Sequence, residues 1–119
     1  MHRMKLQSEP FAMIRSGKKT IELRLYDEKR QQIEVGDTIE FTDIASGETL
    51  VATVKKLHRF CSFDELYRSL PLLQCGYTEE TVASAKPSDM EKYYTVVEQE
   101  KNGVVGIELS LTDSPASRE

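Results

Sequence analysis

The sequence predicts one α+β domain in which a small, curled, antiparallel sheet is flanked by helices. Five segments alternate apolar and polar residues as strands do, two reversals join strands as hairpins, and a helical stretch precedes the last strand. Strands and helices do not alternate regularly, which disfavours a doubly wound parallel sheet. The 119 residues suit a single domain, which we place at 1–111, followed by a disordered polar tail at 112–119.

The first quarter of the chain predicts two strands joined by a helix. Residues 2–7 alternate polar and apolar side chains, and a helix begins near Pro10 and ends at Ser16-Gly17. Residues 18–25 then alternate cleanly, with isoleucine and leucines on one face and polar or charged residues on the other. This segment therefore combines a core-facing side with a charged side.

The remaining strands follow a charged loop at 26–32. Residues 38–42 and 49–58 are separated by a Ser-Gly reversal, so we expect them to pair as a hairpin. The last strand is expected at 104–111, after an Asn-Gly breaker.

Three helical segments are expected between the hairpin and the last strand. The spacing Ser62-Phe63-Asp64-Glu65 is that of a capping box and predicts a helix that ends at Pro71. A second segment is expected at 79–85. A further capping box, Ser88-Asp89-Met90-Glu91, predicts a helix that continues through Val97.

Composition excludes several classes of protein. The chain is 39% hydrophobic and 30% charged, too apolar for a disordered protein, and its apolar runs are far shorter than the ~20 residues of a spanning helix. The N-terminus does not resemble a signal peptide, so we expect a cytoplasmic protein. Cys61 and Cys75 match neither a zinc pattern nor a disulfide framework, and we interpret them as buried, inert thiols. No metal or cofactor is expected.

Charge is distributed unevenly along the chain. The net charge is −4, yet residues 1–30 hold eight Lys or Arg and four Asp or Glu, a balance of +4, which leaves −8 for residues 31–119. Such asymmetry can attract an anionic ligand to one face of the molecule. An ordinary solvated surface explains the charge alone equally well.

The most unusual segment is the charged face that begins at Lys19. Residues on one face of a strand repeat about every 6.7 Å, so Thr20, Glu22 and Arg24 form a row about 13 Å long, enough for one nucleotide. Arginine offers a planar fork for phosphate, and glutamate can accept a hydrogen bond from a base. The alternative is an exposed sheet face on which Glu22 pairs with cations across strands.

These residues resemble a known family. Residues 11–30, with the core Gly17-x-Lys19-x-x-Glu22-x-Arg24, and residues 33–41, Ile-x-Val-Gly-Asp-Thr-Ile-x-Phe, closely resemble the ASCH domain of the PUA-like superfamily. The resemblance extends to the Tyr93-Tyr94 pair and to the strand at 103–108. It implies a PUA-like small antiparallel β-barrel with flanking helices and a cleft lined by the Lys-Glu-Arg row, which binds single-stranded RNA or a nucleotide or nucleoside.

The resemblance leaves catalysis open. One branch of the family hydrolyses acylated cytidine nucleosides with a Lys and a nucleophilic Thr, but Glu22 stands at the position of that Thr. As an enzyme, the protein would use Glu22 to activate water and Lys19 to stabilise the oxyanion, as an amidohydrolase. A ribonuclease would use Glu22 to take the proton of the 2′-hydroxyl, with Lys19 and Arg24 stabilising the phosphorane.

The expected substrate-binding set is wider than the row. Lys29 and Arg30 follow it in a loop where a nucleic-acid backbone can pass, and Tyr94 belongs to the helix near the cleft. The full set is Lys19, Thr20, Glu22, Arg24, Lys29, Arg30 and Tyr94. A third hypothesis, a protein-interaction module that uses the acidic remainder, predicts that Lys19, Glu22 and Arg24 point apart. The oligomeric state is left open.

Overall fold

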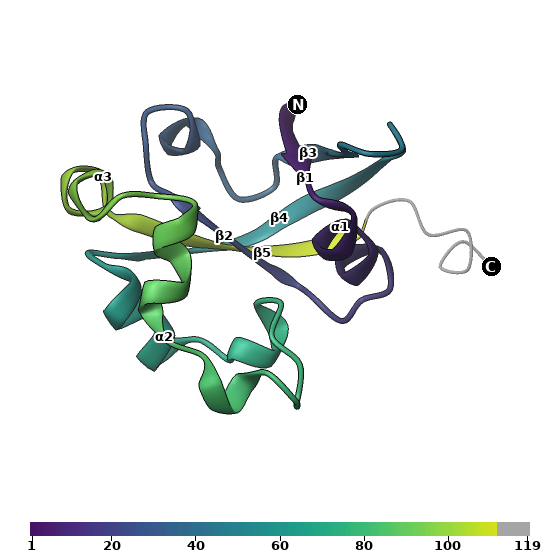
Figure 1. Cartoon of the computed structure of the whole chain (residues 1–119). Coiled ribbons are helices and arrows are strands. Elements are labelled where there is room, and N and C mark those ends of the chain that lie inside the picture. Colours follow the sequence, from purple (N-terminus) through teal and green to yellow (C-terminus); the bar gives the residue numbers. More distant parts are fainter. Residues whose placement is uncertain (112–119) are drawn as a thin grey trace.

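A computed structural model describes residues 1–111 as a curled five-stranded sheet with helices around it (Figure 1). The strands are β1 (His2–Leu6), β2 (Ile21–Leu25), β3 (Thr38–Asp43), β4 (Thr49–Phe60) and β5 (Val104–Leu111). The α-helices are α1 (Ser8–Arg15), α2 (Phe63–Ser69) and α3 (Val96–Asn102). The α+β prediction is confirmed, and the sheet forms a half-barrel. The predicted tail lies outside the described residues.

The strand order is β1-β3-β4-β5-β2. The predicted hairpin of β3 and β4 is present, and β5 pairs antiparallel with both β4 and β2. One pairing differs from the expected antiparallel sheet, because β1 runs parallel to β3. The chain passes through α1 and β2 before it returns to β3, and a connection of this length permits a parallel pair. The half-barrel therefore has β1 and β2 as its two edges.

Two apolar clusters hold the domain together. The first lies between α1 and the inner face of β1, β3, β4 and β5, and its buried members are Met4, Leu6, Phe11, Ile14, Ile33, Ile39, Phe41, Ala52, Val54, Val105, Ile107 and Leu109. The second joins β2 to the connection between β4 and β5, through Ile21, Leu23, Leu25, Phe63, Leu66, Cys75, Met90 and Val104. In Figure 1 much of that connection, in green, lies below the sheet. The apolar face predicted for β2 is thus confirmed.

The helical predictions are confirmed only in part. Ser62 caps α2 as expected, since its hydroxyl accepts a hydrogen bond from the Glu65 backbone N–H. The segments expected at 79–85 and 88–97 instead form 3₁₀ turns at Val82–Ser84 and Pro87–Lys92. Helix α3 begins later than predicted, at a capping box whose two residues are Thr95 and Glu98.

Side-chain bonding explains why the predicted box at Ser88 fails. The Asp89 carboxylate accepts hydrogen bonds from the Lys86 backbone N–H and from the Tyr77 hydroxyl. These contacts belong to a turn that begins one residue before Pro87, so the Ser88 hydroxyl caps nothing. Capping-box spacing is a local signal, and here a tertiary contact overrides it.

Two further observations bear on the sequence predictions. Cys75 is buried as expected, but Cys61 is exposed at the end of β4, so the prediction of two buried thiols is wrong for Cys61. Within residues 1–111 no helix has both the length and the apolar character needed to cross a bilayer.

Candidate functional site

The most unusual feature of the molecule is a buried carboxylate on edge strand β2. The Glu22 side chain is only 5% exposed and lies between two cations. Lys19 Nζ is 2.7 Å from Oε1, and Arg24 Nε donates to Oε2 at 2.7 Å. The cations are themselves 11% and 13% exposed. We call these three residues the Lys19–Glu22–Arg24 triad.

Local backbone geometry places Lys19 beside Glu22. Gly17 has a φ of +84°, a left-handed conformation that glycine adopts without strain, and it reverses the chain between α1 and β2. The Lys19 N–H then bonds to the Met13 carbonyl. A Cβ at Gly76 would lie 3.5 Å from Lys19 Cδ, so the lysine stem packs closely against that glycine. Lys19 therefore precedes the strand and bends back onto Glu22.

Ion pairing keeps the triad charged in spite of its burial. Burial alone would raise the pKa of Glu22, but Lys19 and Arg24 hold it below its ordinary value. Burial would likewise lower the pKa of Arg24, yet Glu22 and the Tyr94 hydroxyl raise it above its usual value. At neutral pH the triad thus carries two positive charges and one negative charge.

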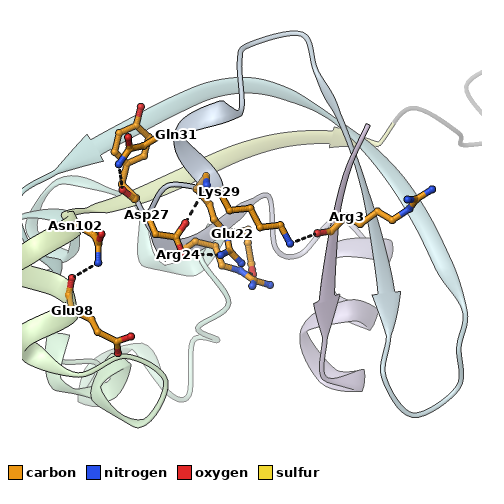
Figure 2. Close-up of polar contacts among 10 residues, drawn as sticks. Arg3, Glu22, Arg24, Asp27, Lys29, Gln31, Glu98 and Asn102 are labelled. Atoms are coloured by element: carbon orange, nitrogen blue, oxygen red, sulfur yellow. Dashed lines mark hydrogen bonds and ion pairs between the residues drawn. The ribbon is translucent and has the colours of Figure 1, made fainter.

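Arg24 also links the two edges of the half-barrel. Its Nη2 donates to the Lys5 carbonyl of β1 at 3.1 Å, and Lys29 Nζ donates to the Arg3 carbonyl of the same strand at 3.2 Å. Figure 2 shows Arg24 beside Glu22 and the Lys29 side chain reaching toward Arg3. Carbonyls on the free edge of β1 are thereby satisfied by side chains instead of by another strand.

The triad borders a hollow of about 490 Å³, within the usual range for ligand pockets. Residues of the β1–α1 segment, of β2 and of the connection between β4 and β5 surround it. Its charged lining residues are Lys5, Glu9, Lys19, Glu22, Arg24, Asp89 and Lys92. Its aromatic lining residues are Tyr67, Tyr77, Tyr93 and Tyr94.

Sequence reasoning missed most of the far wall of this hollow. Tyr67 and Tyr77 hydroxyls lie 2.8 Å apart, and Tyr77 donates to Asp89 Oδ2 at 2.7 Å. Phe63 stacks on Tyr94, with ring centroids 6.3 Å apart. Phe63 and Tyr67 lie on α2, whereas Tyr77 and Asp89 lie in the turns that follow it. No sequence pattern signalled that Tyr67, Tyr77 and Asp89 face β2, and of this wall only Tyr94 belonged to the predicted binding set.

The structure brings together four of the seven predicted binding residues. Lys19, Glu22, Arg24 and Tyr94 all line the hollow. Thr20 does not, because its hydroxyl bonds to Gln74 at 3.2 Å on an exposed surface.

The two cations of the loop also lie outside the lining. Lys29 reaches the edge of β1, as described above, and Arg30 Nη1 donates to Asp27 at 3.0 Å. The charged loop thus contacts the edge of β1 beside the hollow, but neither Lys29 nor Arg30 lines the hollow. Among residues 1–111, no three His, Cys, Asp or Glu side chains are grouped so that they could hold a metal ion.

The curled half-barrel with helices at its sides places the chain in the PUA-like class of domain. The model of the ASCH domain family matches residues 4–112, and the chain therefore belongs to the ASCH domain family. The resemblance stated from the sequence is confirmed.

Solved structures agree with this assignment. Hypothetical protein PH0355 is 36% identical, with a TM-score of 0.73 over 92% of this chain and 96% of its own. Protein PF0455 from Pyrococcus furiosus is 33% identical, with a TM-score of 0.73 over 95% of this chain and 98% of its own. ASCH from Zymomonas mobilis shares the fold at 16% identity and a TM-score of 0.60, over 91% of this chain and 65% of its own. The search of curated proteins gave no match.

Proposed function

We propose that the hollow binds a nucleotide or a segment of single-stranded RNA in the cytoplasm. Lys19 and Arg24 contact phosphate, and Glu22 accepts a hydrogen bond from a base or a hydroxyl. The observation that carries the proposal is the Lys19–Glu22–Arg24 triad itself: a charged group of three side chains, almost fully buried, on one wall of a hollow of nucleotide size.

The charge of the triad supports an anionic ligand. Two cations share one carboxylate, which leaves a balance of +1 in a place shielded from water, where electrostatic attraction is stronger than at the surface. Guanidinium and ammonium groups are the usual partners of phosphate. A phosphate oxygen that approaches Lys19 or Arg24 would complete the charge balance.

The aromatic wall supports a nucleobase. Four tyrosines line the hollow, and Tyr93 is largely exposed, with Lys92 Nζ 5.2 Å from its ring centroid. Bases stack on aromatic rings with little dependence on sequence, at about 1–3 kcal/mol per base. A hollow with cations on one wall and rings on another suits a ligand that has a phosphate and a planar base.

We extend the proposal to Lys29 and Arg30 for ligands longer than one nucleotide. Lys29 and Arg24 bond to carbonyls two residues apart on β1, so their head groups lie along the same edge. A strand of RNA that leaves the hollow along this edge would meet Lys29 next. Lys29→Ala should therefore weaken binding of an oligonucleotide while leaving the affinity for a mononucleotide unchanged.

The test is a titration of labelled RNA oligonucleotides and nucleoside monophosphates at several salt concentrations. The log of the oligonucleotide affinity should fall with log salt by about 0.7 for each neutralised phosphate. Arg24→Ala and Lys19→Met should weaken binding, with Arg68→Ala as the control, because Arg68 is exposed on α2 outside the hollow. Circular dichroism confirms that each variant is folded. The absence of both nucleotide and RNA binding, or RNA binding that does not depend on salt, would refute the proposal.

Hydrolysis in the same hollow is the second candidate, favoured by the 2.7 Å contact between Lys19 and Glu22. A general base works best when its pKa is near the working pH, whereas the cations lower the pKa of Glu22, so the triad favours binding over base catalysis. Incubation with an acylcytidine and with RNA, followed by mass spectrometry, tests this candidate. Turnover by the wild type that Glu22→Gln abolishes would support it, and full activity of that variant would exclude Glu22 as the base.

The interaction-module hypothesis made a geometric prediction that fails. It required the side chains of Lys19, Glu22 and Arg24 to point apart, but Lys19 and Arg24 both contact the Glu22 carboxylate.

A further inference from the structure

A second polar group, independent of the triad, lines the same hollow. Tyr67, on α2, and Tyr77, in the turn that follows, have hydroxyl oxygens 2.8 Å apart. Tyr77 in turn donates to Asp89 at 2.7 Å. Tyr67, Tyr77 and Asp89 line the same hollow as the Lys19–Glu22–Arg24 triad, and so does the buried Cys75. The two polar groups therefore face one ligand space.

Each tyrosine hydroxyl has a single proton, which sets the direction of the chain. The Asp89 carboxylate is an acceptor, and the hydrogen bond from Tyr77 lowers its pKa, so it is ionised at neutral pH. Tyr77 donates its hydroxyl hydrogen bond to Asp89, so toward Tyr67 its oxygen can only accept. Tyr67 must therefore be the donor in the contact with Tyr77. Burial raises the pKa of both tyrosines, so both keep their protons.

The Tyr67 hydroxyl is therefore left as a hydrogen-bond acceptor toward a ligand. Its proton is committed to Tyr77, and no other group of residues 1–111 donates to its oxygen. Tyr67 is partly buried and lines the hollow, so the remaining lone pair of its oxygen is available to a donor supplied from there. A hydroxyl that is free to rotate could accept or donate equally well. The Tyr67 hydroxyl can only accept from a ligand, because Asp89 holds Tyr77 in place as the acceptor of the Tyr67 proton.

We propose that Tyr67 is a specificity-determining residue that accepts a hydrogen bond from an amino group on the ligand, held in that role by Tyr77 and Asp89. This inference rests on the proposed nucleotide-binding function and narrows it to bases that bear an exocyclic amino group. An oxo group at the same place would bring two acceptors together, and a site built for a donor rejects an analogue that lacks it.

The experiment uses two matched pairs of probes, AMP with IMP and CMP with UMP, in which an amino group is exchanged for an oxo group. Isothermal titration of the intact protein should show the amino member of at least one pair bound about three- to tenfold more tightly, the range expected for one hydrogen bond. Tyr77→Phe keeps Tyr67 in place but frees its proton, so the preference should disappear. The readout is the ratio of affinities within a pair, which a general weakening of the site would leave unchanged.

Two substitutions at Asp89 test whether the nucleotide preference depends on a hydrogen-bond acceptor at this position or on the negative charge of Asp89. In Asp89→Asn the amide oxygen can still accept from Tyr77 and from the Lys86 N–H, so the preference should persist, whereas Asp89→Ala should abolish it. Tyr26→Phe is the control for loss of a tyrosine hydroxyl, because Tyr26 contacts Arg59 away from the hollow.

The outcomes distinguish the inference from the function on which it rests. Equal binding within both pairs, a preference for the oxo member, or a preference that survives Tyr77→Phe would overturn the role of Tyr67 and leave nucleotide binding intact. Failure of all four nucleotides to bind would overturn the role of Tyr67, and the absence of RNA binding as well would overturn the proposed function.

Discussion

The guanidinium of Arg24 lies 2.7 Å from the carboxylate of Glu22, although the two residues are separated by one position on β2. Because they share a face of the strand, their Cα atoms are about 6.7 Å apart and the side chains lean together. The same guanidinium reaches the Lys5 carbonyl on β1. One side chain thus neutralises a buried charge and joins the two edges of the sheet.

Arg24→Ala should therefore destabilise the fold as well as weaken binding. Removing one partner of a buried ion pair leaves charge uncompensated, and we expect the free energy of unfolding to fall by about 3 kcal/mol. Urea denaturation measures this loss. Arg68→Ala, on the exposed side of α2, should change stability by less than about 0.5 kcal/mol. A similar small effect at both positions would show that the Arg24 contact contributes little.

The low pKa of Glu22 makes stability depend on pH in the acid range. The folded-state pKa of Glu22 lies below the ordinary glutamate value of 4.5, so the unfolded chain takes up the proton first as pH falls. The stabilisation from this group is fully present above about pH 4.5 and is lost as pH falls through the folded-state pKa.

Comparison with Glu22→Gln isolates this contribution, because several other carboxylates also have lowered pKa values. The difference in unfolding free energy between wild type and variant should shrink between pH 5 and pH 3, as measured by denaturant titration at each pH. A difference that stays constant across this range would mean that the pKa of Glu22 is not lowered by folding.

The two cysteines should react at very different rates. Cys61 is exposed, whereas Cys75 is buried and burial raises the pKa of its thiol to about 11, which leaves almost no thiolate at neutral pH. A thiol reagent should modify one site per native molecule and two after unfolding. Cys61→Ser should remove the native reaction, and rapid native labelling of that variant would contradict the burial of Cys75.

Replacement of Gly106 on β5 by alanine should destabilise the fold. An added Cβ would lie 2.7 Å from Leu70 Cδ1 and 3.1 Å from Ile21 Cγ2, so neighbouring side chains must shift. We expect Gly106→Ala to cost about 1–3 kcal/mol of stability, measured by thermal or urea unfolding.

A double-mutant cycle assigns that cost to the close contact. Leu70→Ala makes room for the new methyl group, so the double variant should be more stable than the sum of the two single effects predicts. Additive effects would show that Gly106 is required for another reason.

The strands could be predicted because each strand segment has a local signal in the sequence. In β3 the alternation of apolar and polar residues matches the burial that the structure shows, and in β2 and β5 the positions predicted to face the core are mostly buried, although some of their neighbours are buried as well. Turn glycines separate the segments. The connection between β4 and β5 could not be predicted in the same way. Its turns depend on contacts such as Tyr77 with Asp89, which join residues 12 positions apart and leave no periodic trace.

The same distinction applies to the candidate site, where some residues could be predicted from local sequence and others could not. Strand spacing was enough to place Glu22 and Arg24 on one face, and the resemblance of the core Gly17-x-Lys19-x-x-Glu22-x-Arg24 to the ASCH domain added Lys19, which precedes β2. The sequence did not indicate that Glu22 is buried, because an alternating pattern reads the charged face of an edge strand as exposed. Tyr67, Tyr77 and Asp89 come from other elements and were missed.

The amino-acid sequence alone thus determined the α+β class, the strand segments and the identity of the ionic row. Those depend on periodicity, turn residues and spacing, which act over a few positions. Tertiary structure decided that β1 runs parallel to β3, that Arg24 reaches the edge of β1, and that a tyrosine wall faces the triad. These depend on how distant segments pack, and packing energy depends on the whole fold.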